Sequence, residues 1–187
     1  MRTWLVARRR APRLPRLLRR AGQYPPFASL VDLSGPEFGK PGDDMAERVR
    51  AGCARLGEPV PEDDEALVRC VVDSMALATT GALEEAQRLA AQDVSALHVV
   101  GGGAANDLYL ADLSAASSLP VVAGPVEASA IGNHFMQLRE AGLAGEREEM
   151  RAMLAASFPT KKITRDTALA EKAKRARRRI GAATFAI

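Results

Sequence analysis

Residues 95–106 read Ser-Ala-Leu-His-Val-Val-Gly-Gly-Gly-Ala-Ala-Asn, and the rest of the chain is organised around this stretch. A short apolar run, Leu97 to Val100, stops at three glycines, and Asn106 then opens a segment of helical character. A strand that ends in a glycine turn and enters a helix presents backbone N–H groups to a nucleotide. Because glycine has no Cβ, a ligand can approach such a main chain closely. The stretch predicts either a nucleotide-binding turn or a bare strand-to-helix turn, and these residues alone leave both open.

Two well-known phosphate motifs do not fit the glycine turn. The dinucleotide fingerprint Gly-x-Gly-x-x-Gly requires glycine where Asn106 stands. The P-loop requires a Gly-Lys-Ser/Thr triplet, and none follows the three glycines. The turn therefore belongs to neither class.

Composition places the chain among ordinary soluble proteins. Its 187 residues suit one domain with a real core, and 47% of them are hydrophobic. No apolar run approaches the ~20 residues of a membrane span, and the N-terminus lacks the apolar region of a secretion signal. We therefore expect a cytoplasmic protein without a membrane partner. Aromatic residues make up 4% of the chain, which argues against base stacking and makes nucleic acid an unexpected partner.

The net charge of +3 hides a strong asymmetry along the chain. Residues 1–20 carry eight arginines and no acid, and residues 161–187 carry nine Lys/Arg against two acids. The two ends therefore total +15, which leaves −12 for residues 21–160. Basic ends bind anionic polymers or lipids, extend as disordered tails, or fold back on an acidic body. We favour the two alternatives without a binding role, disordered tails or ends that fold back, since neither end shows a recognised binding motif.

The periodicity of apolar residues predicts a helix-rich α/β fold. Helices are expected near 45–57, 65–91, 107–117, 127–141 and 146–156, with strands at 97–100 and 120–123. Thr79 to Gly81 is a weak point of the longest helix by propensity. Residues 22–44 are rich in turns and allow at most a short strand at 29–33, and residues 159–187 are expected to pack loosely. Two parallel strands are a poor core, so part of the sheet is missing from this prediction.

No complete active site is evident among the reactive side chains. Cys53 and Cys70 fall on successive helices, where they form either a disulfide or, as we expect in the cytoplasm, two buried thiols. With no cluster of His and Cys, no metal ligands are predicted. His98 and His134 are interpreted as structural, and the acidic groups fall at helix starts, where the macrodipole accounts for them.

Four stretches together are more specific than the glycines alone. They are Asp-Leu-Ser-Gly-Pro-Glu-Phe-Gly-Lys-Pro-Gly-Asp-Asp-Met (32–45), Arg-Cys-Val-Val-Asp-Ser-Met-Ala-Leu (69–77), Leu-His-Val-Val-Gly-Gly-Gly-Ala-Ala-Asn (97–106) and Val-Val-Ala-Gly-Pro-Val-Glu-Ala-Ser-Ala-Ile-Gly-Asn (121–133). In this order and spacing the chain resembles the C-terminal part of rhamnulokinases, which are FGGY-family carbohydrate kinases. The resemblance covers about residues 27–158, which we take as the kinase domain, between a basic N-terminal segment (1–26) and a basic C-terminal tail (159–187).

The resemblance implies a fold, a reaction and a site. The fold would be an incomplete ribonuclease-H-like domain of the actin-like ATPase architecture. The reaction would transfer the γ-phosphoryl group of Mg-ATP to L-rhamnulose, so the implied cofactors are ATP and Mg²⁺. Carried over by motif, Gly102 is the main nucleotide contact, Gly101 and Gly103 lie beside it, and Asn106 lies near the nucleoside.

The resemblance also implies what this chain lacks. The family's catalytic aspartate, its sugar pocket and the first three strands of the domain's sheet lie upstream of anything present here, so no catalytic residue is assigned. Two positions depart from the family pattern: Asp112 stands where leucine is usual, and Ser118 replaces a glycine before the second strand. We therefore expect a truncated kinase portion that is inactive alone. The alternatives are a non-catalytic remnant whose basic tails bind a partner or anionic polymer, and a fragment with no stable fold.

Overall fold

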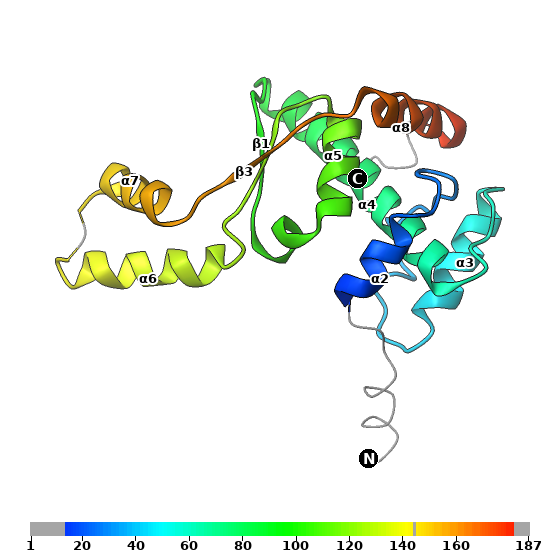
Figure 1. The fold of residues 1–187 in the computed structure, drawn as a ribbon, viewed down its shortest axis with the longest axis horizontal. Coiled ribbons are helices and arrows are strands. Elements are labelled where there is room, and N and C mark those ends of the chain that lie inside the picture. Colours follow the sequence, from blue (N-terminus) through cyan, green and yellow to red (C-terminus); the bar gives the residue numbers. More distant parts are fainter. Residues whose placement is uncertain (1–13, 144, 182–187) are drawn as a thin grey trace, which may run out of the picture.

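The computed structural model describes residues 14–143 and 145–181 as a helix-rich α/β fold with one small sheet (Figure 1). The elements in chain order are α2 (Leu14–Ala21), α3 (Met45–Arg55), α4 (Asp64–Ala90), β1 (Leu97–Val99), the 3₁₀ helix η1 (Gly101–Ala105), α5 (Asp107–Ser117), β2 (Val121–Ala123), α6 (Ala128–Glu140), α7 (Arg147–Ser157), β3 (Lys161–Ile163) and α8 (Thr167–Ile180). The expected α/β class with few strands is confirmed, and the five expected helices each lie within a few residues of their predicted bounds.

Helix α4 is the central element, because it contributes to all three clusters of buried apolar side chains. Leu77 packs in the first cluster, Ala76 in the second and Cys70 in the third. Asp63 caps the helix, accepting a hydrogen bond from the Ala66 amide at 2.8 Å. The helix runs without a break through the predicted weak point at residues 79–81, because burial on three sides outweighs low propensity.

By length and composition α4 could also cross a membrane, with a mean hydropathy of 1.4 in its most apolar window. Half of that window is buried inside the protein, and the helix carries the buried Arg69 and Asp73. Its apolar faces are covered by the chain's own elements, as in the core helix of a soluble domain.

The sheet has the order β1-β2-β3. Strands β1 and β2 are parallel, with Leu97 opposite Val121, and β3 is antiparallel to β2, with Ile163 opposite Val121. The third strand was not predicted, since two of its three residues are exposed lysines without an alternating apolar pattern. Lysine is common on edge strands, where it discourages pairing with other chains.

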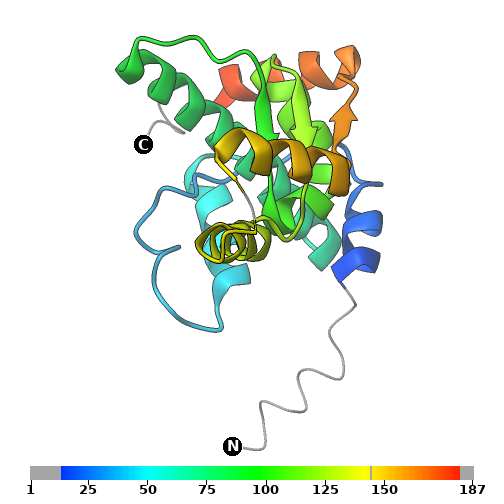
Figure 2. The same cartoon turned by 90° about the vertical axis from the view of Figure 1, so that its left-hand side faces the viewer.

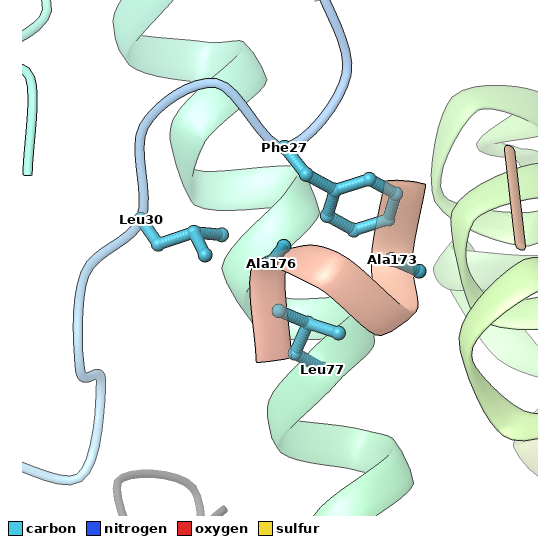
Figure 3. Close-up of a cluster of buried hydrophobic side chains, with 5 residues drawn as sticks. All are labelled: Phe27, Leu30, Leu77, Ala173 and Ala176. Atoms are coloured by element: carbon cyan, nitrogen blue, oxygen red, sulfur yellow. The ribbon is translucent and has the colours of Figure 1, made fainter. Parts of the chain in front are cut away.

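The expectation of loose packing for residues 159–187 is wrong for α8. Ala173 and Ala176 are 2% and 1% exposed and pack against Leu77, Phe27 and Leu30 (Figure 3). Alanines at a spacing of three allow the backbone of α8 to approach α5 closely, so the helix needs no large apolar anchors. Arg179 adds a salt bridge to the buried Glu58 at 2.7 Å.

The short strand allowed at residues 29–33 does not form, although Leu30 and Val31 are fully buried there. Their segment is held by side chains of α4 instead of by a neighbouring strand. The Phe27 amide donates to Asp73 Oδ2 at 2.6 Å, and the Val31 amide donates to Ser74 Oγ at 3.0 Å. The sequence also allows a short helix from Trp4 to Arg10, and these residues lie outside the described part of the chain.

Helices α6 and α7 form an arm that projects from the sheet side of the molecule, where they lie side by side (Figures 1 and 2). Neither helix has a buried residue among its described positions, and a salt bridge between Arg139 and Glu146 joins them at 3.1 Å. The arm therefore adds little to the core, which lies between α4, α5 and α8.

Candidate functional site

The glycine turn forms the 3₁₀ helix η1 between β1 and α5, as the sequence predicted in outline. Gly101 has φ +72°, a left-handed conformation that favours glycine, and its amide donates to the Pro125 carbonyl at 3.1 Å. The Gly124 amide donates in turn to the Val99 carbonyl at 2.9 Å. These two bonds tie the turn to the loop after β2, so the turn is part of a fixed framework.

Gly102 is the most open of the three glycines. A Cβ built on it would meet no atom within 4 Å, whereas a Cβ on Gly103 would touch Val99 and Tyr109 at ordinary contact distances. Gly102 is exposed and its φ is not positive, so neither packing nor backbone strain requires glycine there. The open space at Gly102 is therefore available for close approach of a ligand to the main chain.

Asn106 is the N-cap of α5. Its Oδ1 accepts from the Tyr109 amide at 3.2 Å, and its own amide donates to the Gly103 carbonyl at 3.1 Å. The cap bond uses the oxygen of the side-chain amide, so the Nδ2 group keeps its two donors for a ligand. Capping thus fixes the orientation of a polar group beside the glycine turn.

The turn faces an apolar cleft of about 540 Å³. Helix α4 supplies one wall through Leu67 and Val71, α2 supplies another through Leu14 and Leu18, and the end is closed by the site residues and their neighbours: Gly102, Gly103, Ala105 and Asn106. A concave, largely apolar cleft with one or two oriented polar groups is typical of a small-molecule site. Its chemistry suits a flat heteroaromatic ring that is stacked between aliphatic walls and hydrogen-bonded at one edge.

A second cavity of about 620 Å³ lies on the other side of Asn106, between α2 and α5. Both cavities share Pro15, Leu18, Ala105 and Asn106, so they flank the same residues. Arg19 lines the second cavity and supplies a cation there. Asp107 lines the same cavity and places a carboxylate beside this cation, so the cavity offers a ligand both charges.

The structure brings Gly102, Gly103 and Asn106 together on one cleft, whereas Gly101 supports the turn from behind and does not line it. Sequence reasoning missed the α2 wall, because Leu14 and Leu18 are embedded among arginines. The spacing of four residues between Leu14 and Leu18 is the signal that places them on one face of a helix. His98 and His134 are both exposed and line none of the described cavities.

A buried ion cluster holds α5 against α4 behind the site. Arg69 donates to Asp73 Oδ1 at 2.5 Å and to Asp112 Oδ1 at 2.7 Å, and all three side chains are buried. Burial raises the pKa of Asp112 to about 8, with the Asp73 charge adding to the rise and Arg69 opposing it. Burial also raises the pKa of Asp73 against the effect of Arg69. One arginine thus serves two buried carboxyl groups, and burial favours the protonated form of Asp112.

The described residues around the cleft form no metal-binding cluster. Across residues 14–143 and 145–181, no group of three or more His, Cys, Asp and Glu side chains is placed to hold an ion. Cys53 and Cys70 are free and buried, with 3.5 Å between their sulfur atoms.

Comparison with known proteins identifies the family of the chain. Residues 2–141 match the model of the FGGY family of carbohydrate kinases, C-terminal domain. A rhamnulokinase of Bacteroides thetaiotaomicron is 39% identical over 147 residues, which cover 79% of this chain and 30% of that protein. A rhamnulokinase of Pectobacterium carotovorum is 37% identical over 166 residues, covering 86% of this chain and 33% of that protein. The chain spans about a third of the length of these relatives. It belongs to the FGGY family of carbohydrate kinases, and its residues 2–141 match that family's C-terminal domain.

Proposed function

We propose that this chain is the ATP-binding C-terminal portion of a kinase that phosphorylates L-rhamnulose, and that it is not active alone. The observation that carries the proposal is the apolar cleft at Gly102 and Asn106, which combines room for an adenine ring with open main chain. Both relatives described above are rhamnulokinases, which supports the choice of sugar. A cytoplasmic location and the domain bounds 27–158 are part of the same proposal.

In this proposal the chain's own residues bind and orient the nucleotide. The walls from α2 and α4 exclude water from the base, and Asn106 donates to its edge or to the ribose. Gly102 lets the backbone approach where a side chain would collide with the ligand. ATP supplies the phosphoryl group, and positioning accounts for most of the catalysis in phosphoryl transfer.

The sugar pocket, the catalytic base and the Mg²⁺ ligands would come from the part of the relatives that this chain does not cover, about two thirds of their length. The purified chain should therefore show no turnover of L-rhamnulose with Mg-ATP. A rate in the ordinary kinase range, ~1–100 s⁻¹, would contradict this part of the proposal.

The binding site is tested by calorimetric titration of ATP into the wild type and two valine variants. Gly102→Val should abolish binding, because the new side chain fills the ligand's space without disturbing the fold. Gly132→Val is the matched control, since Gly132 lies on exposed α6, away from the cleft, and a Cβ there also meets nothing within 4 Å. Equal affinity of the wild type and Gly102→Val would refute the site.

A further inference from the structure

A second concave surface lies between the C-terminal part of α5 and helix α8, away from the glycine turn. It has a volume of about 630 Å³ and is lined by residues of α4, α5 and α8 together with Arg165. Four cations line it, Arg165, Lys174, Arg177 and Arg178, against the two carboxylates of Glu84 and Glu171. We call this surface the basic groove. Nothing in the proposed kinase function uses it.

The basic groove is built on a firmly placed helix. The Ala170, Ala173 and Ala176 face of α8 is buried against its neighbours, and Figure 3 shows two of these alanines packed beside Leu77 and Phe27. Anchoring through small residues leaves the long basic side chains of α8 on its outer faces. The Cα positions of Lys174, Arg177 and Arg178 are therefore fixed by the packing of the helix.

Only part of the positive charge in the groove is neutralised within the chain. Arg177 forms a salt bridge with Glu84, and Arg165 donates to Ser118 Oγ at 3.0 Å. The side chains of Lys174 and Arg178 form no hydrogen bond or salt bridge with any residue in the part of the chain that the structure describes. Two free cations beside two oriented guanidinium groups favour an anionic partner, and guanidinium groups match phosphate geometry best.

We propose that the basic groove docks the phosphate backbone of a nucleic acid duplex. Base stacking is not required for this mode of binding, which agrees with the scarcity of aromatic residues in the chain. Binding is electrostatic and independent of sequence, with each neutralised phosphate adding to its salt dependence. The assignment differs from the sequence-based expectation, because the fold gathers Arg165 and α8 around one concavity that the linear charge count does not show.

Fluorescence anisotropy with a labelled 20-base-pair DNA duplex tests the proposal on the full chain between about 50 and 200 mM salt. The variant Lys174→Glu/Arg178→Glu removes the free cations of the groove. Lys172→Glu/Arg175→Glu is its matched control, because it makes the same change in net charge on the same helix at residues that do not line the groove. The arginines of residues 1–20 contribute equally to both variants, so their difference measures the groove alone.

The groove variant should bind at least about fivefold more weakly than the control variant, and its log–log salt slope should fall by about 2, since each lost phosphate contact removes about 0.9. Equal weakening of the two variants, or no binding by the wild type at 50 mM salt, would overturn the proposal. So would displacement of the duplex by poly-glutamate as effectively as by unlabelled DNA, which would point to an acidic protein.

Two further measurements exclude misfolding of the variants and overlap with the proposed ATP site as explanations of the result. Circular dichroism checks that both variants fold, and the pairs Lys174→Gln/Arg178→Gln and Lys172→Gln/Arg175→Gln repeat the comparison if charge reversal unfolds the chain. Gly102→Val should bind the duplex like the wild type. Loss of DNA binding in that variant would contradict a groove that is separate from the proposed ATP site.

Discussion

The buried cluster of Arg69, Asp73 and Asp112 makes folding stability depend on pH in a specific direction. Burial raises the pKa of Asp112 from 3.8 to about 8 in the folded chain. Between these values the folded state holds a proton that the unfolded state has released. The stability contribution is therefore fully present below about pH 4, falls as the pH rises, and is lost once the pH passes about 8.

The size of the change in unfolding free energy follows from the size of the pKa shift of Asp112. One pKa unit corresponds to about 1.4 kcal/mol, so this one group should lower the free energy of unfolding by on the order of 5 kcal/mol between pH 4 and 8. That is a large share of the roughly 5–15 kcal/mol of an ordinary domain. Urea denaturation should therefore resolve the change in the free energy of unfolding for each pH unit in this range.

The substitution Asp112→Asn tests this reasoning, because it keeps an oxygen that accepts from Arg69 and removes the ionisable group. Urea unfolding from pH 5 to 9 should give a flatter pH profile for the variant, which should become the more stable protein above about pH 8. Asp107→Asn is the control. Asp107 begins the same helix and makes an exposed salt bridge with Lys161, so its loss should leave the slope unchanged. Parallel profiles for the wild type and Asp112→Asn would refute the assignment.

Three other outcomes are expected. Ser118 has φ +60°, so Ser118→Gly should stabilise the fold by up to about 1 kcal/mol in thermal denaturation, despite losing the bond from Arg165; a lower melting temperature would contradict this. Leu77→Ala should cost about 2–5 kcal/mol, because Leu77 is 1% exposed, while Met75→Ala in the same helix, 45% exposed, should cost less than about 1 kcal/mol. Thiol titration of the denatured chain should find two free thiols, Cys53 and Cys70, both with and without prior reductant. Finding no free thiol in the sample without reductant would instead show a disulfide.

Several features could be predicted from the sequence because they depend on residues close together in the chain. Helix α5 has the predicted bounds, since Asn106 caps it and Ser118 ends it in a left-handed conformation. Helix α4 begins at Asp64, one residue before its predicted start, directly after its N-cap Asp63. The glycine turn between a strand and a helix was likewise predicted from the sequence, and so was the family to which the chain belongs.

The tertiary structure alone decided which distant segments meet. The walls of the cleft come from α2 and α4, which are some fifty residues apart in the chain, and no local pattern states that they face each other across Gly102. Asp112 looked like a departure within a helix, and only the packing of α5 on α4 shows that it shares Arg69 with Asp73. Helix α8 looked like a polar tail, because alanines give a weak hydrophobic signal; close packing made them core residues. Local hydrogen bonding and periodicity fix the elements, whereas burial and shared charges depend on how those elements pack.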